Sequence, residues 1–207
     1  MEVVWTDFGG VLTPPIAETF ALVVAAVGVP EQAFRTAIDA VAADFGLHAL
    51  EPMERGLLTQ SEWGRRVTAA LAPTWRPAID LAHFGDYWYA GRVLNRALYD
   101  RLVALKQRGL RIGLLTNSIR EWEPYRRAML PDTTLFDARI NSFEAGIGKP
   151  DPDIYSLAEV ALGVAGSGCL LIDDLPVNCA AAANRGWHAL LHVTNLPTLA
   201  ELGRLAG

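Results

Sequence analysis

The first half of the chain carries one short apolar run followed by a long stretch with helical spacing. Val3 to Trp5 are β-branched and aromatic, which favours a short buried strand. Apolar residues then recur at helical intervals, and no clear strand precedes residue 110. This block is therefore interpreted as a helical cap inserted after the first strand. We expect helices at residues 16–27, 31–43 and 79–89, a loop at 48–53, and a helix capped by Ser61 that contains Trp63, Val67 and Leu71.

From residue 95 onward, apolar runs alternate with helical stretches. The predicted strands are 111–115, 138–142, 169–173 and 187–192, and the predicted helices are 95–108, 121–129, 152–162, 177–185 and 198–205. Such alternation implies parallel strands, right-handed crossovers and helices on both faces. The sequence therefore predicts an α/β fold, a Rossmann-like doubly wound parallel sheet. We expect its core domain at residues 1–14 and 95–207 and the inserted α-helical cap domain at 15–94.

Composition narrows the class of partners. The chain has 207 residues, 51% of them hydrophobic, which suffices for one substantial core and an inserted subdomain. A net charge of −5 without runs of like charge argues against nucleic acid, and Arg126 and Arg127 are expected on a solvated helix face. The longest apolar stretch, residues 20–30, is too short to span a bilayer, so we expect no membrane partner.

The cysteines and the start of the chain indicate a compartment. Cys169 falls in an apolar strand and Cys179 at a helix start, so buried free thiols are expected rather than a disulfide. The chain opens directly into a strand, without the basic and apolar segments of a secretory signal. Both features favour a reducing cytoplasm.

Polar residues gather at four strand ends or the turns that follow them. Because the carboxyl ends of parallel strands meet at one edge, where open α/β sheets bind ligands, we expect these residues to converge. Gly9 and Gly10 let the backbone turn sharply and approach a ligand or metal closely. The four groups are Asp7, Thr116 to Ser118, Lys149 within Gly-Lys-Pro-Asp-Pro, and the pair Asp173 and Asp174.

Each group alone has an ordinary explanation: an Asx turn, loop chemistry, a solvated lysine or a helix cap. Together they fit phosphoryl transfer. Asp7 and Asp174 are a minimal carboxylate pair for Mg²⁺, which keeps several waters and uses few protein ligands. Hydroxyl and amide groups at Thr116 and Asn117 can donate to phosphate oxygens, and Lys149 would neutralise the anions. We therefore predict nucleophilic catalysis through an aspartyl-phosphate.

The same segments form a known set of motifs. They read Asp-Phe-Gly-Gly-Val-Leu-Thr from Asp7, Leu-Leu-Thr-Asn-Ser through Thr116, Gly-Lys-Pro-Asp-Pro-Asp-Ile-Tyr through Lys149, and Ile-Asp-Asp-Leu-Pro-Val-Asn up to Asn178. This set resembles the haloacid dehalogenase-like (HAD) hydrolase superfamily, in the branch with a helical cap, over essentially the full length. The cap stretches Glu54-Arg55-Gly56 and Ser61-Glu62-Trp63 are similar to those of sugar-phosphate phosphatases and epoxide hydrolase phosphatase domains.

The resemblance implies a sheet order of 5-4-1-2-3, a Mg²⁺ cofactor and a role for each motif residue. Asp7 would be the nucleophile. Thr116 and Asn117 would hold the phosphoryl group, and Lys149 would steady it. The implied metal ligands are Asp7, Asp174, Asp173 directly or through water, and the backbone carbonyl of Gly9, with Asn178 orienting the acidic pair.

Gly9 departs from the family's pattern. Phosphatases of this family usually have a second Asp there, whose carboxyl group protonates the leaving alkoxide and later activates water. Losing such a group costs roughly 10²–10⁴-fold in rate. Three outcomes are open: a substrate with a good leaving group, a substitute from the cap (His48, Glu51 or Glu54) or from water, or slow turnover.

The leading prediction is a Mg²⁺-dependent phosphatase for a small phosphorylated substrate, a metabolite of the cytosol. His48 is a candidate substrate-binding residue, or else an ordinary surface histidine. A 2-haloacid dehalogenase uses the same nucleophile without metal, but Asp173 and Asp174 would then add negative charge beside an anionic substrate. A third alternative is a weakly active or degenerate member that binds phosphorylated ligands. The aromatic residues from Phe84 to Tyr89 could line the pocket, form the cap's core or serve a homodimer, and the sequence does not specify the substrate.

Overall fold

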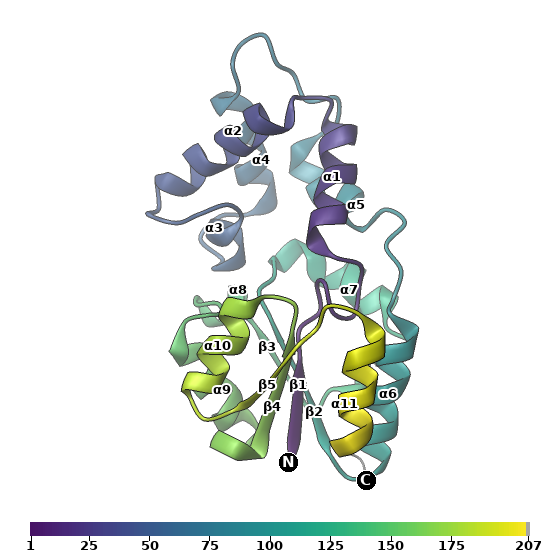
Figure 1. Ribbon diagram of the computed structural model, residues 1–207. Helices are drawn as coiled ribbons and strands as arrows, with labels where there is room; N and C mark the ends of the chain where they lie inside the picture. The colour runs from purple at the N-terminus through teal and green to yellow at the C-terminus, as the bar shows by residue number, and fades with distance from the viewer. Residues whose placement is uncertain (206–207) are drawn as a thin grey trace.

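A parallel sheet with helices on both faces lies below a separate layer of helices in the computed structural model, which describes residues 1–205 (Figure 1). The five strands lie in the order β3-β2-β1-β4-β5, and all pair in parallel. Read from the other edge, this is the expected order 5-4-1-2-3, so the predicted α/β fold is confirmed. The strands are β1 Val3–Thr6, β2 Arg111–Thr116, β3 Ala138–Asn141, β4 Cys169–Asp173 and β5 His188–Leu191.

Alternate strand residues point to opposite faces of the sheet and pack on different helices. On one face, Val4, Ile112 and Leu170 pack with α6 (Arg96–Gln107) and α11 (Asn195–Leu205). On the other face, residues including Trp5 and Leu171 pack with α9 (Pro152–Leu162) and α10 (Pro176–Asn184). The two pairs of helices cover the two faces in Figure 1. Both faces of the central strands are therefore buried, as their continuous apolar runs require.

The helices between β1 and α6 form a second hydrophobic cluster. Its largest buried side chains include Phe34, Trp63 and Phe84, and Trp88 stacks on Trp122 with ring centroids 5.0 Å apart. Because Trp122 lies in the 3-10 turn that follows β2, this cluster is continuous with the sheet's upper edge. The helices are α1 Ile16–Val27, α2 Glu31–Ala43, α3 Glu51–Glu54, α4 Gln60–Ala70 and α5 Phe84–Tyr89, with a 3-10 turn η1 at Leu81–His83.

Short helices complete the chain. They are α7 Glu123–Met129 and α8 Ser142–Ala145, with 3-10 turns η2 Arg120–Trp122, η3 Thr133–Leu135 and η4 Gly166–Gly168. The division between core and cap at residues 14/15 and 94/95 stays a prediction. Residues 206 and 207, which the core was expected to include, lie outside the described residues.

Several predicted boundaries were wrong. Thr59, not Ser61, caps α4, because its hydroxyl accepts a hydrogen bond from the Glu62 N–H at 3.1 Å. The predicted loop at 48–53 contains the start of α3, and the predicted end of β3 at residue 142 is instead the first residue of α8. The segment 79–89 is divided between η1 and α5, and α11 begins at Asn195, three residues before the predicted start at Thr198.

Two structural findings concern membrane-spanning helices and the state of the cysteines. Within the described residues, no helix alone is long and apolar enough to cross a membrane; α1 and α2 reach that length and composition only together, with a bend of 103° between them. Both cysteines are free thiols, as expected. Cys169 is buried, whereas Cys179 is only half-buried.

Candidate active site

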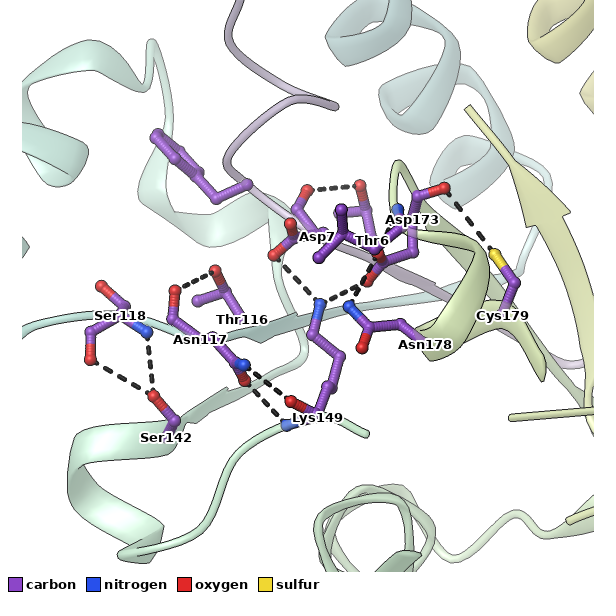
Figure 2. A network of polar contacts seen from close by, with 12 residues as sticks. Thr6, Asp7, Thr116, Asn117, Ser118, Ser142, Lys149, Asp173, Asn178 and Cys179 are labelled. Carbon is purple, nitrogen blue, oxygen red and sulfur yellow. Dashed lines mark hydrogen bonds and ion pairs between the residues drawn. The ribbon is translucent and has the colours of Figure 1, made fainter. Parts of the chain in front are cut away.

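Asp7, Asp173 and Lys149 meet at the carboxyl ends of β1 and β4 (Figure 2), and the Asp174 carboxylate lies beside them. The strands bring them together because β1 pairs with β4, and the Asp7 N–H donates to the Ile172 carbonyl at 2.9 Å. Lys149 Nζ lies 2.5 Å from Asp173 Oδ2 and 3.1 Å from Asp7 Oδ1. One oxygen each of Asp7, Asp173 and Asp174 lies within 4.8 Å of the others. The structure thus brings these four predicted side chains to one point.

Asp173 is held by protein donors on both oxygens. Its Oδ1 accepts from the Asn178 side-chain amide and from the Leu175 N–H, each at 2.9 Å, while Oδ2 faces Lys149. Asn178 belongs to α10, which starts directly after this strand end. This arrangement fixes the lysine and favours an indirect role for Asp173 toward a cation. The expectation that Asn178 orients the acidic pair agrees with its hydrogen bond.

The site carries more negative than positive charge. Burial raises the pKa of Asp7, the charge of Asp173 adds to this, and Lys149 opposes it. Burial and the charges of Asp7 and Asp173 raise the pKa of Asp174 to about 7. Burial disfavours the charged form of Lys149, but Asp7 and Asp173 outweigh it and raise its pKa. Three carboxylates around one ammonium therefore fit a divalent cation such as Mg²⁺, which prefers oxygen ligands.

The turn after Asp7 depends on Gly10. Its φ of +75° is one that residues with a side chain rarely adopt, and an added Cβ would lie 2.1 Å from Asp174 Oδ2. A side chain at this position would therefore displace the Asp174 carboxyl group. At Gly9, an added Cβ would meet the Ile16 Cδ1 methyl at 2.8 Å. The position where related phosphatases have an acid is thus bordered by an apolar side chain.

The residues after β2 divide between the site and its support. Thr116 is buried at the strand end, where its hydroxyl donates to the Asn117 carbonyl at 3.4 Å. The Asn117 side chain exchanges two 2.8 Å hydrogen bonds with the backbone of Lys149. The Asn117 side chain therefore anchors the turn that carries Lys149. Ser118 pairs through its backbone with the Ser142 hydroxyl.

A cavity of about 740 Å³ opens above Asp7, between the sheet edge and the cap. Its floor includes Asp7, Thr116, Lys149 and Asp174. His48 borders it but is exposed. The aromatic segment contributes differently along its length: Trp88 and Tyr89 line the cavity, Phe84 is buried in the cap cluster, and Tyr87 is exposed. Further cap residues along the wall are Ile16, Phe20, Arg35, Ile38, Asp39, Leu50, Glu51 and Glu54.

Arg126 was wrongly expected on a solvated helix face. Its side chain is 3% exposed, and Nη2 donates to Asn141 Oδ1 at 3.0 Å and pairs with Glu123. The guanidinium borders the cavity, and its Nε and Nη1 have no partner among the described residues. Arg127 is exposed, as expected. No local sequence pattern indicated this position, which depends on the contact of α7 with Asn141 of β3.

Comparison with known proteins shows which family has these motifs. Residues 1–186 match a family model described as haloacid dehalogenase-like hydrolase. Mouse bifunctional epoxide hydrolase 2 is 24% identical over 97% of the chain, but the chain spans only 38% of that protein's length. A Mycobacterium tuberculosis protein named as a phosphatase is 37% identical over 34% of the chain and 33% of its own length.

Solved structures share the fold. A HAD family enzyme from Bacteroides thetaiotaomicron, in complex with magnesium and inorganic phosphate, has a TM-score of 0.71 and 19% identity, covering 96% of this chain and 98% of that one. A 2-haloacid dehalogenase from Pseudomonas syringae pv. tomato DC3000 has a TM-score of 0.69 and 18% identity, covering both chains fully at 100%. These similarities establish the architecture alone.

Proposed function

Because the chain belongs to the haloacid dehalogenase-like hydrolases, we propose that it is a Mg²⁺-dependent phosphomonoester hydrolase that acts on a small phosphorylated metabolite. The observation that carries the proposal is the meeting of Asp7, Asp173 and Asp174 around the single ammonium of Lys149. The phosphatase names of several relatives support it, as does the magnesium and phosphate complex of a structural neighbour.

The proposed reaction uses the chain's own groups in order. A carboxylate oxygen of Asp7 attacks phosphorus, the bond to the leaving oxygen breaks, and water later releases phosphate from Asp7. Thr116 donates to a phosphoryl oxygen, and Lys149 holds the nucleophile and balances the transferred charge. Asp7, Asp174 and the Gly9 carbonyl would hold Mg²⁺, with Asp173 behind them. Bound there, Mg²⁺ would offset the negative charge of the nucleophile and of the phosphoryl group.

Hydrolytic dehalogenation of a 2-haloacid is the second candidate. The fold shared with a Pseudomonas dehalogenase and the missing carboxyl group at Gly9 favour it. The excess negative charge disfavours it, since Asp173 and Asp174 would face an anionic substrate with only Lys149 to offset them. A degenerate phosphate-ligand binder is a third reading, and the intact set of site residues speaks against it.

A paired assay tests the proposal. Phosphate release from 4-nitrophenyl phosphate and chloride release from 2-chloropropionate are measured with Mg²⁺ and with excess chelator. We expect Mg²⁺-dependent phosphate release that Asp7→Asn abolishes, and no chloride release. Phosphate release that persists in chelator would show that the reaction does not need a metal ion. Chloride release without metal would favour the dehalogenase.

The proposal also covers the location of the protein and its partners. We propose a cytoplasmic location, supported by two free thiols, and no nucleic-acid or membrane partner, supported by a net charge of −5 without a basic patch in the sequence pattern. A homodimer through the aromatic segment gains no support. Phe84 and Trp88 are buried within the chain, which leaves Tyr87 as the exposed aromatic of that segment.

A further inference from the structure

The proposed phosphatase needs a proton source that its core does not supply. When a phosphate ester breaks, the departing oxygen takes the bonding electrons, and an alkoxide leaves slowly unless it is protonated. Gly9 offers no side chain, and the neighbouring position is filled by the Ile16 methyl. Lys149 is committed to Asp7 and Asp173. Because Asp174 would hold Mg²⁺, the side chains left to donate a proton lie on the cap side of the cavity.

Four cap side chains with a carboxyl or imidazole group border the cavity, and three are unsuited to the task. His48 and Asp39 are exposed. Glu51 is paired with Arg55 at 3.3 Å. Glu54 differs, since its side chain is half-buried and its carboxyl group has neither an ion-pair nor a hydrogen-bond partner among residues 1–205. Its carboxyl group is therefore free to meet a ligand in the cavity.

Contacts with the core hold α3, the short helix that carries Glu54. Glu54 ends α3, which packs on α8 of the core. Gly56, two residues later, approaches α8 so closely that an added Cβ would lie 2.7 Å from the Phe143 carbonyl oxygen. This backbone contact holds the end of α3 at the rim of the site. A residue held on packed elements is more precisely placed than one on a free loop.

We propose that Glu54 is the catalytic acid and base of this site and replaces the carboxyl group missing at Gly9. In the first step the Asp7–phosphorus bond forms, the ester bond breaks, and the Glu54 proton passes to the leaving oxygen, which departs as an alcohol. In the second step water attacks phosphorus and gives its proton to the Glu54 carboxylate. The electron pair of the breaking bond returns to Asp7, and phosphate leaves. The inference rests on the phosphatase function proposed above.

The electrostatic environment of Glu54 suits both steps. Burial raises its pKa to about 7, with the charges of Glu51 and Asp7 adding to the effect. A carboxyl group of this kind is partly protonated near neutral pH, so it can donate a proton in one step and accept one in the next.

Two substrates with matched shapes test the role. The leaving group of 4-nitrophenyl phosphate departs unaided, whereas that of 4-nitrobenzyl phosphate needs a proton. In single turnovers with Mg²⁺, we expect Glu54→Gln to slow alcohol release from the benzyl ester roughly 10²-fold and nitrophenol release less than about tenfold. Glu51→Gln should show no such preference between the two substrates. An equal effect of Glu54→Gln on both, or none, would overturn the role.

Restoring the acid at position 9 gives an independent test. Gly9→Asp displaces only the flexible tip of Ile16, so the backbone can stay in place. In the Glu54→Gln background it should recover most of the benzyl ester rate, and in the wild type it should add far less. Equal gains in both backgrounds would refute the substitution of one carboxyl for the other. A wild type that releases no phosphate from either ester would overturn the proposed function together with this inference.

Discussion

At the scale of single residues, the glycine after Gly9 sets the tightest constraint. Gly10 combines a left-handed backbone with the close approach of Asp174, and either feature alone disfavours a side chain. Gly46, in the turn after α2, has a similar φ of +67°, but an added Cβ would meet nothing within 4 Å. The two positions therefore separate backbone strain from damage to the acidic cluster.

We expect Gly10→Ala to lower Mg²⁺-dependent phosphate release by about 10²-fold, because Asp174 has to move away from Asp7. Gly46→Ala should lose about 1 kcal/mol of unfolding free energy to backbone strain and keep its activity. Steady-state kinetics and urea unfolding of both variants check this. Equal activity losses would show that the contact with Asp174 is unimportant.

The sequence located those site residues whose position follows from a strand end. Asp7, Thr116 and Asp173 each close an apolar run, so the geometry of a parallel sheet brings them together without further information. Arg126 and Glu54 were not located in this way. Their positions at the cavity depend on how α7 packs on β3 and how α3 packs on α8, and no local sequence pattern encodes these contacts.

At the scale of elements, α4 and the η1 turn are in direct backbone contact at Gly64. Gly64 makes this possible, since an added Cβ would lie 2.5 Å from the Leu81 carbonyl carbon and 2.6 Å from the Ala82 nitrogen. Gly203 in α11 has nothing within 4 Å of the corresponding position. The same substitution therefore has opposite expected effects in these two helices.

Gly64→Ala should lower the free energy of unfolding by about 1–3 kcal/mol, because overpacking against backbone outweighs the gain in helix propensity. Gly203→Ala should raise it by about 0.5–1 kcal/mol, the ordinary gain for Ala over Gly in a helix. Urea unfolding of the two variants measures both. A stabilised Gly64→Ala protein would mean that α4 and η1 do not pack as described.

Long elements were predictable and short ones were not. The periodic signal of 16–27 and 31–43 gave α1 and α2 with their observed bounds. In contrast, α3 and α8 have four residues each, about one helical turn, which is too short for a period to show. The helix α3, most of which was predicted as a loop, carries Glu54. The sequence pattern therefore did not indicate that Glu54 lies on a packed helix at the candidate site.

At the scale of the whole molecule, polar and aromatic contacts tie the cap to the sheet. Trp122 donates to Gln60 Oε1 at 2.7 Å, and the Gln60 N–H donates to Glu121 Oε1 at 3.0 Å. Near the cap's two connections, Arg92 donates to the Pro14 carbonyl at 3.0 Å. The contacts that hold the cap over the sheet thus join residues far apart in sequence. The alternation of strands and helices predicted the layers, whereas the order of the strands came from the family resemblance.

The most direct test of the account asks whether Asp7 itself receives the phosphoryl group. The protein is mixed with Mg²⁺ and 4-nitrophenyl phosphate, quenched rapidly, reduced with borohydride and digested for mass spectrometry. Borohydride converts an acyl phosphate to an alcohol, so we predict homoserine at position 7 only when substrate and Mg²⁺ are both present. Phosphate release with Asp7 unmodified in every sample, or with another carboxylate modified instead, would contradict the account.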